Sequence, residues 1–261
     1  SALDKIVAAA ELTPDDTVLE IGPGPGPLTR RLATHAGRVI AVELDGRMVE
    51  LLRTEVAVGL PAEVVQADIL TLDLGELMAA RGVAHYKIVA NLPYYITSAV
   101  LRHIFEASLK PTRVVVLVQR EVAERIVAKP PDMNLLGVSV QLFGAPRVVA
   151  RVPAGAFYPP PKVDSSVVRI DVYSQPAEGV TDTNEFFRIV RAGFGQKRKQ
   201  LRNSLAHGLS RPGAEIEAAL AAAGIDPTRR AETLSLAEWA RLQSALAGEA
   251  STHPRMRPAE G

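Results

Sequence analysis

The sequence contains no cysteine and no long hydrophobic run. Without cysteine, the chain has no disulfide scaffold, no thiol nucleophile and no thiolate metal site. The longest aliphatic stretch, residues 114–118, is far too short to span a bilayer. No charged segment followed by an apolar one opens the chain, as an export signal would. We therefore expect a cytoplasmic protein that does not associate with membranes, and we find no internal repeat.

Acidic and basic residues balance over the whole chain but not along it. The formal net charge is +1 for 261 residues. Residues 1–182 hold 18 Lys and Arg against 21 Asp and Glu, whereas residues 183–261 hold 12 against 8. The segment 188–211 has no acid and seven basic residues, namely Arg188, Arg191, Lys197, Arg198, Lys199, Arg202 and Arg211. Such a block indicates a polyanion partner, most simply nucleic acid, although a solvated helix face has the same composition.

The first two-thirds of the chain alternate short apolar runs with helical patterns. Strands are predicted at 17–21, 39–44, 63–66, 87–91 and 113–119, and helices at 27–35, 46–58 and 96–109. This alternation is typical of an α/β fold with a parallel, doubly wound sheet. Two further strands, 147–152 and 163–172, have no helix between them and are therefore predicted to be antiparallel.

The last third of the chain has a different character. Residues 173–182 are rich in turn formers and are predicted to be a linker. Residues 183–247 are predicted to be helical throughout, with interruptions at Gly208, Pro212, Gly224 and Pro227. We therefore predict a sheet domain at 1–173, a small all-helical domain at 183–247 and a frayed tail at 251–261.

A glycine-rich loop follows the first predicted strand. Gly22, Gly24 and Gly26 allow close backbone approach to a ligand, and Pro27 suits the first turn of a helix. The dinucleotide-binding fingerprint has a third glycine where Pro27 stands. Together with the preceding Glu20, the spacing fits the methionine part of S-adenosyl-L-methionine (SAM) better than a pyrophosphate, although a stiff connecting turn is the simpler alternative.

An acid ends each of the next two predicted strands. Glu43 lies where a carboxylate can accept hydrogen bonds from both ribose hydroxyls, and Asp68 lies where it can accept one from the adenine amino group. Either acid alone is typical of a solvated loop. Because open parallel sheets bind ligands at the carboxyl ends of their strands, the pair favours a cofactor that contains a nucleoside.

The fourth predicted strand ends in a motif suited to methylation of a ring-conjugated amine. The side chain of Asn91 and the carbonyl of Leu92 can both accept hydrogen bonds from such an NH₂ group, and Pro93 fixes the backbone between them and Tyr94. Tyr94 offers a flat face on which a base stacks. A second aromatic residue, Phe157, precedes three prolines and can cover the other face of a flipped base. The alternatives are a tight turn with buried tyrosines and a polyproline stretch bound by another protein.

Four motifs occur in order and together resemble one family. They are Glu-Ile-Gly-Pro-Gly at 20–24, Asn-Leu-Pro-Tyr at 91–94, Phe-Tyr-Pro-Pro-Pro-Lys-Val-Asp-Ser at 157–165 and Phe-Gly-Gln-Lys-Arg-Lys-Gln-Leu-Arg-Asn at 194–203. The chain resembles the ribosomal RNA adenine N6,N6-dimethyltransferase family, in its KsgA/RsmA branch. The resemblance covers nearly all of residues 3–247, including Arg-Ala-Glu-Thr-Leu-Ser at 230–235.

The resemblance implies a Rossmann-like methyltransferase domain followed by a small helical domain that contacts RNA. It implies dimethylation of N6 on two adjacent adenines in a hairpin loop near the 3′ end of small-subunit (16S) rRNA, linked to ribosome subunit maturation. SAM is the expected cofactor, S-adenosyl-L-homocysteine the product, and no metal or oligomer is expected. The resemblance places Gly22, Glu43, Asp68 and Asn91 at SAM, and Asn91, Leu92, Pro93, Tyr94 and Phe157 around the adenine. We expect RNA contacts from Arg191, Lys197, Arg198, Lys199 and Arg202.

One departure and two rival interpretations accompany the resemblance. Family members carry a Gln-Asn/His-Phe-Leu segment before their first helix, whereas this sequence begins at Ser1; we therefore expect the chain as printed to bind SAM weakly. The nearest rival function is adenine methylation of large-subunit rRNA, as in the antibiotic-resistance branch. The other is a non-catalytic RNA-binding assembly factor, against which the acceptors around Asn91 argue.

Overall fold

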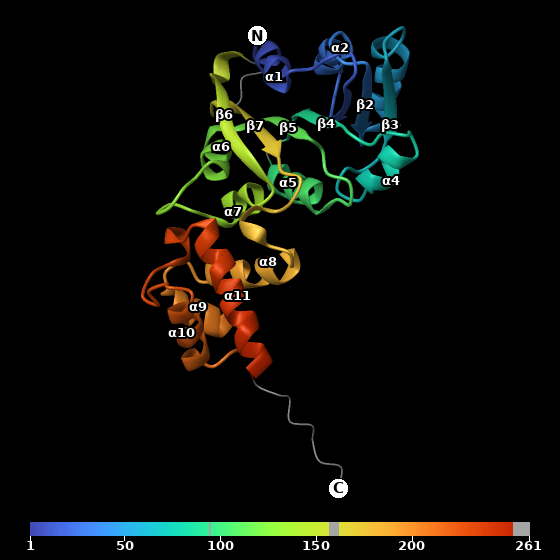
Figure 1. Cartoon of the computed structure of the whole chain (residues 1–261). Helices are drawn as coiled ribbons and strands as arrows, with labels where there is room; N and C mark the ends of the chain where they lie inside the picture. The colour runs from blue at the N-terminus through green and yellow to red at the C-terminus, as the bar shows by residue number, and fades with distance from the viewer. Residues whose placement is uncertain (94, 157–161, 253–261) are drawn as a thin grey trace. The chain divides into compact units, whose positions relative to one another are not determined.

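The computed structural model describes residues 1–93, 95–156 and 162–252, with side chains up to residue 248. Contacts divide the chain into two compact units (Figure 1). Unit 1 consists of Ser1–Val127 and Phe143–Ser174, and unit 2 of Ala128–Leu142 and Gln175–Gly261. The membership of Ala128–Leu142 in the helical unit did not form part of the sequence prediction, because nothing in its composition separates it from the segments around it.

Unit 1 contains a mixed sheet of seven strands in the order β3-β2-β1-β4-β5-β7-β6. The strands are β1 (Thr17–Ile21), β2 (Arg38–Glu43), β3 (Ala62–Gln66), β4 (Lys87–Asn91), β5 (Arg113–Gln119), β6 (Gly144–Val152) and β7 (Ser165–Val172). The first five pair in parallel, whereas β7 is antiparallel to both β5 and β6. The predicted fold class, a Rossmann-like parallel sheet with an antiparallel hairpin at its end, is confirmed.

The last two strands differ from the prediction at their first residues. β6 begins at Gly144 rather than at residue 147, so that it includes Pro146, and β7 begins at Ser165 rather than at residue 163. Proline is tolerated there because β6 is the edge strand of the sheet, where a missing N–H costs no ladder bond on the open side. Gly144 is required by close packing, since a Cβ atom would lie 2.7 Å from the Ile170 side chain.

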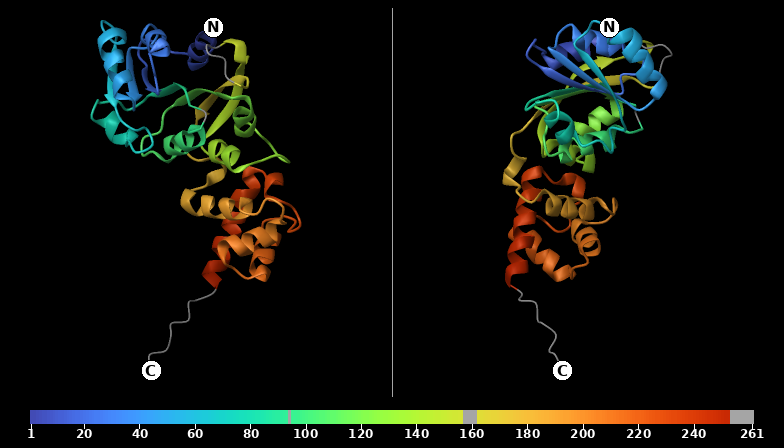
Figure 2. Two further views of the ribbon diagram at one scale, coloured as in Figure 1. Left: turned by 180° about the vertical axis from the view of Figure 1, so that it is seen from behind. Right: turned by 90° about the vertical axis from the view of Figure 1, so that its right-hand side faces the viewer.

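Helices cover both faces of the sheet (Figures 1 and 2). Those of unit 1 are α1 (Ala2–Ala10), α2 (Pro27–Ala33), α3 (Gly46–Leu51), α4 (Leu74–Ala79), α5 (Thr97–Glu106) and α6 (Arg120–Ile126). α1 and α2 pack on one face against Val18, Val39, Val89 and Val115. α3 continues into a π-helical turn, Leu52–Val56, and the two together occupy most of the single helix predicted at 46–58.

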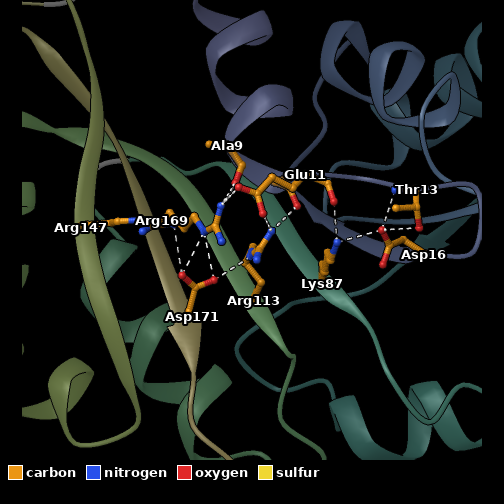
Figure 3. A network of polar contacts seen from close by, with 10 residues as sticks. Ala9, Glu11, Thr13, Asp16, Lys87, Arg113, Arg147, Arg169 and Asp171 are labelled. Carbon is orange, nitrogen blue, oxygen red and sulfur yellow. Dashed lines mark hydrogen bonds and ion pairs between the residues drawn. The ribbon is translucent and has the colours of Figure 1, made fainter.

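Ion pairs close the edge of the sheet at which the parallel strands begin (Figure 3). Arg113 and Arg169 both bond to Asp171, at 2.8 and 3.0 Å, and both also pair with Glu11. Their guanidinium groups donate to the carbonyls of Ala10 and Ala9, the last residues of α1. Since carbonyls at a helix end have no partner within the helix, these two side chains fix the end of α1 to the sheet.

Unit 2 is helical. Its helices are α7 (Leu135–Gln141), α8 (Thr183–Phe194), α9 (Leu201–Leu209), α10 (Gly213–Ala222) and α11 (Leu236–Thr252). The core forms around the fully buried Trp239, whose ring lies 5.8 Å from that of Phe194. α11 runs two residues into the segment predicted as a frayed tail, and residues 253–261 lie outside the described part of the chain.

The prediction that Gly208 interrupts a helix was wrong. α9 continues through Gly208, and the break between α8 and α9 falls at the basic residues 195–200 instead. Gly208 is required because α8 and α9 come into close contact there: a Cβ atom would lie 2.6 Å from that of Ala192. The glycine therefore allows close helix packing, a role that cannot be distinguished from a helix break in the sequence.

A half-buried ion pair fixes the start of α11. Arg229 pairs with Glu238 at 2.5 Å, and Ser235 and Glu238 form a capping box in which each side chain accepts the other's backbone N–H. The hydrogen bond from Arg229, followed by those from Ser235, lowers the pKa of Glu238 to about 2. In the part of the chain that the structure describes, no helix is long and apolar enough to cross a membrane.

Candidate active site

The loops that follow β1, β2, β3 and β4 meet at the carboxyl edge of the sheet. The N–H of Gly22 donates to the carbonyl of Val42 at 2.9 Å, and the N–H of Ala67 donates to the carbonyl of Glu43 at 3.0 Å. On the other side, a Cβ atom on Gly22 would lie 4.0 Å from Cδ of Pro93. The strand order therefore brings together four loops that are separated by up to about 70 residues in the sequence.

The glycine loop after β1 has the left-handed backbone that only glycine adopts without strain. Gly22, Gly24 and Gly26 have φ values of 63°, 55° and 81°. Gly26 also caps α2 and leaves no room for a side chain, because a Cβ atom would lie 2.7 Å from Val56. Pro27 occupies the first turn of α2, as predicted. Around Gly24, by contrast, a Cβ atom would meet no atom of the described residues within 4 Å, so this backbone is open to a ligand.

Glu43, the last residue of β2, holds the glycine loop. One carboxylate oxygen accepts the N–H of Gly24 at 3.1 Å, and the other accepts those of Leu44 and Asp45 at 2.8 and 2.9 Å. A carboxylate has about four acceptor sites, so one remains for a hydroxyl group. The sequence predicted only a contact with ribose; the hydrogen bonds with the loop give Glu43 a structural task as well.

Asp68 lies just beyond β3 and is half-buried. Its Oδ1 atom accepts the N–H of Leu70 at 2.9 Å, which forms the turn. Its Oδ2 atom has no protein partner among the described residues and remains able to accept a hydrogen bond from an amino group.

Glu20 lies near the end of β1 and is buried rather than exposed at the carboxyl edge. The residue is 1% exposed, and neither carboxyl oxygen has a hydrogen-bond donor in the described part of the chain. Burial, together with the negative charge of Glu43, raises the pKa of Glu20 to about 8, and the nearby Thr29 hydroxyl of α2 opposes this rise only in part. Glu20 is therefore mostly protonated at neutral pH, an outcome that the sequence prediction of a cofactor contact did not include.

The motif after β4 combines an exposed amide with a fixed turn. Asn91 is exposed at the end of β4, whereas the side chain of Leu92 is 2% exposed. The carbonyl of Pro93 accepts hydrogen bonds from the N–H of Ile96 at 3.2 Å and from the Thr97 hydroxyl at 3.3 Å, so it joins the turn to α5. The two remaining residues predicted at the target base, Tyr94 and Phe157, lie outside the described residues.

The sequence prediction missed three apolar side chains near the carboxyl edge. Leu44 follows Glu43 and is 65% exposed, Leu70 lies two residues after Asp68, and Tyr95 follows the Asn91 motif and is 89% exposed. An exposed apolar residue after the last polar residue of a strand is a weak signal by itself. Its repetition after three strands that end at the same sheet edge is the signal that could have identified these residues.

The predicted RNA-binding residues lie on unit 2. Arg191 is exposed in the last turn of α8, and Lys197, Arg198 and Lys199 are exposed in the turn between α8 and α9. Arg202 forms an ion pair with Glu217 of α10 at 3.2 Å. Among the described residues of the turn, no acid neutralises the three consecutive cations, so the turn carries a local excess of positive charge.

The chain belongs to the ribosomal RNA adenine dimethylase family, whose model matches residues 1–247. It is 52% identical over 248 residues to ribosomal RNA small subunit methyltransferase A of Dehalococcoides mccartyi (strain CBDB1), covering 94% of this chain and 84% of the relative. It is 45% identical over 251 residues to the protein of the same name from Pelotomaculum thermopropionicum, covering 92% and 85%.

Two solved structures share the fold over nearly the whole chain. The dimethyladenosine transferase from Plasmodium falciparum is similar at a TM-score of 0.78 and 25% identity, covering 95% of this chain and 96% of that one. The 23S rRNA methyltransferase ErmE is similar at a TM-score of 0.72 and 30% identity, covering 94% and 97%.

Proposed function

We propose that this chain uses SAM to dimethylate N6 of two adjacent adenines in a hairpin loop near the 3′ end of small-subunit rRNA, as a step in ribosome subunit maturation. The observation that carries the proposal is the meeting of Gly22–Gly26 backbone, Glu43, Asp68 and Asn91 at one sheet edge. Relatives that are 42–52% identical are named as small-subunit rRNA methyltransferases, which supports the small-subunit substrate over the large-subunit alternative.

The residues at this edge fit SAM in three places. The open backbone at Gly24 offers space for the methionine part, and Glu43 has an acceptor site left for a ribose hydroxyl. Within the described residues, one carboxylate oxygen of Asp68 has no protein partner and is suited to the adenine amino group. When bound, SAM supplies an electrophilic methyl group on its sulfonium. The chain's own residues hold the target adenine and align its nitrogen with that methyl group.

Asn91 and Leu92 orient the target nitrogen. The lone pair of an adenine N6 is delocalised into the ring, which makes it a poor nucleophile. Acceptance of both N–H bonds by the Asn91 side-chain oxygen and the Leu92 carbonyl favours a pyramidal nitrogen whose lone pair faces the methyl group. Pro93 lacks an N–H and fixes its own φ, which holds that carbonyl in place. Tyr94 and Phe157 are proposed to stack on the base.

The rate enhancement then comes mainly from alignment. Holding the nitrogen in line with the methyl group converts a bimolecular encounter into an effectively unimolecular step. The proton leaves the nitrogen after the methyl has been transferred, so no strong general base is required. Glu20, buried behind the loop, is proposed to act on the cofactor side rather than on the adenine.

Methyl transfer to isolated ribosomal subunits tests the proposal. The chain is incubated with radiolabelled SAM and small subunits that lack the modification, with large subunits in parallel, and the RNA is digested to nucleosides. We expect labelled dimethyladenosine from small subunits alone. Label in large subunits alone would assign the chain to the other substrate, and absence of label with intact SAM binding would favour a non-catalytic assembly factor.

A further inference from the structure

Unit 2 contains a hollow of about 500 Å³ between α8 and α9. Three small residues, Ala192, Gly195 and Gly208, line it together with polar side chains. The hollow exists because Gly208 lets the two helices pack closely: a Cβ atom there would lie 2.6 Å from the Ala192 Cβ. Gly195 and Gly208 are exposed, so the backbones of the two helices are accessible at this place.

The polar side chains around the hollow differ in how they are engaged. Arg188 is held by two hydrogen bonds with Glu185, each of 2.6 Å. Arg191 and His207 are exposed, and neither side chain has a hydrogen bond or ion pair within the residues that the structure describes. Ser204 turns its hydroxyl toward the carbonyls of Gln196 and Gln200, so it belongs to the helix junction rather than to the hollow.

The charge of the residues around the hollow favours an anionic ligand. No acidic residue lines it, and the segment from residue 188 to 211 carries seven basic residues and no acid. The volume of the hollow is many times the volume of about 30 Å³ that one water molecule occupies in the liquid. The hollow is therefore larger than a lone phosphate needs. A shallow floor of glycine and alanine suits a sugar-phosphate backbone, because it allows close approach without competing side chains.

We propose that this hollow binds one nucleotide of the RNA substrate through its phosphodiester and ribose. Arg191 donates to the phosphate oxygens, which a guanidinium can bind in a bidentate manner, and His207 and Gln196 contact the phosphate or the 2′-hydroxyl. The site adds an anchoring point to the exposed turn at residues 197–199. That the ligand is RNA rests on the proposed function; the site itself rests on the geometry of α8 and α9.

Arg191→Gln and His207→Gln test the site, with Arg151→Gln on β6 as a charge-matched control. The probes are a fluorescent single-stranded RNA of mixed sequence and inorganic phosphate as competitor, both in the full-length chain at several salt concentrations. We expect Arg191→Gln to weaken RNA binding about five- to tenfold and to reduce the salt slope by about 1, because one phosphate contact is lost. His207→Gln should weaken binding about two- to threefold, and Arg151→Gln should do neither.

Each outcome decides the inference. Unchanged RNA affinity and salt slope in Arg191→Gln overturn the site, and an equal loss in Arg151→Gln assigns the effect to net charge and also overturns it. If inorganic phosphate at matched ionic strength displaces RNA equally well from the wild-type chain and from Arg191→Gln, the phosphate contact lies outside the hollow and the nucleotide site is overturned. If the wild-type chain fails to methylate ribosomal subunits while Arg191→Gln still loses RNA affinity, the site stands and the proposed function fails.

Discussion

The polar side chains at the two edges of the sheet in unit 1 differ in how completely they are paired within the protein. At the edge where the parallel strands begin, Lys87 bonds to Asp16 at 2.8 Å, and Arg113 and Arg169 share Asp171 and Glu11 (Figure 3). At the edge where they end, Asp68 keeps an unused carboxylate oxygen and Glu20 has no partner among the described residues. The side chains named at the first edge are paired within the protein, whereas Asp68 and Glu20 at the second edge have carboxyl oxygens without a partner among the described residues.

We therefore expect the first edge to contribute mainly to stability and the second edge mainly to ligand binding, although the same strands run between them. A polar group that is already paired contributes to folding, and it has little left to offer a ligand. A buried group without a partner costs stability, and it becomes favourable only when something else pairs with it. Changes at the first edge should therefore alter unfolding, and changes at the second should alter binding and catalysis.

The largest effect is expected at Asn91. Asn91→Ala should lower methyl transfer about 10²- to 10³-fold, because the target nitrogen loses one of two acceptors that align it. Affinity for RNA should be retained, since the side chain carries no charge. Single-turnover assays with small subunits measure the rate. Asn91→Asp keeps an acceptor oxygen and should lose less; if both variants retain the wild-type rate, the proposed role of this edge is wrong.

The next effect belongs to the opposite edge and concerns stability alone. Arg169 is 7% exposed, and Arg169→Met removes one of the two arginines that Asp171 and Glu11 share, leaving Arg113. The free energy of unfolding should fall by about 2–4 kcal/mol in urea titrations. Arg147→Met removes a more exposed partner of the same Asp171, at 3.5 Å, and should cost less than about 0.5 kcal/mol. Loss of SAM affinity in folded Arg169→Met would contradict the separation of the two edges.

The pH dependence of stability should have opposite signs at the two edges. Burial acts to raise the pKa of Asp171, but hydrogen bonds from Arg169 and Arg113 hold this pKa below its usual value. The stability that the ionised Asp171 contributes is therefore lost as the pH falls below about 4. The raised pKa of Glu20, about 8, means that stability is lost as the pH rises from about 4.5 toward 8.

Glu20→Gln should remove the loss of stability that occurs as the pH rises toward 8. Glutamine keeps the shape without the charge, so the free energy of unfolding near pH 8 should rise by about 1–3 kcal/mol relative to the wild type, and by less near pH 5. Urea titrations at a series of pH values measure this. Glu55→Gln, at an exposed position, should follow the wild-type curve. A Glu20→Gln curve parallel to that of the wild type would show that Glu20 is charged in the folded chain.

The smallest effect is expected at Glu43. Glu43→Gln keeps one acceptor oxygen but loses the charge and part of the loop contact with Gly24. Affinity for SAM should fall about three- to tenfold by calorimetry, the size of one weakened charge-assisted hydrogen bond. Glu50→Gln, on the exposed side of α3, should bind SAM as the wild type does. A larger effect on unfolding than on SAM binding would assign Glu43 to structure alone.

Much of the fold could be predicted because the strands carry local signals. The apolar runs at β1, β4 and β5 begin and end where the sequence indicates, since each is bounded by a polar or turn-forming residue. The site follows for the same reason: a glycine loop, two acids and an amide each lie at the end of a strand or within two residues of it. Parallel pairing then brings them to one edge without further information.

The remainder depends on contacts between distant segments. Nothing near Arg169 in the sequence indicates that it meets Glu11, or that Gly208 lies against Ala192. Likewise, Glu20 could be predicted as an acid beside a ligand, but its burial follows from α2 lying over it. Such features depend on which elements pack together, and a single sequence does not contain that information locally.

The position of β7 has a consequence for how the chain is assembled. β7 follows β6 in the sequence but lies inside the sheet between β5 and β6, and its Arg169 meets Glu11 across 158 residues. The contacts of Arg169 with the end of the first helix therefore form only after β7 has been synthesised, later than those of Arg113 on β5. Until β7 emerges, β5 remains an open, strongly apolar edge, so this stretch of synthesis is when the nascent chain is most exposed to misassociation.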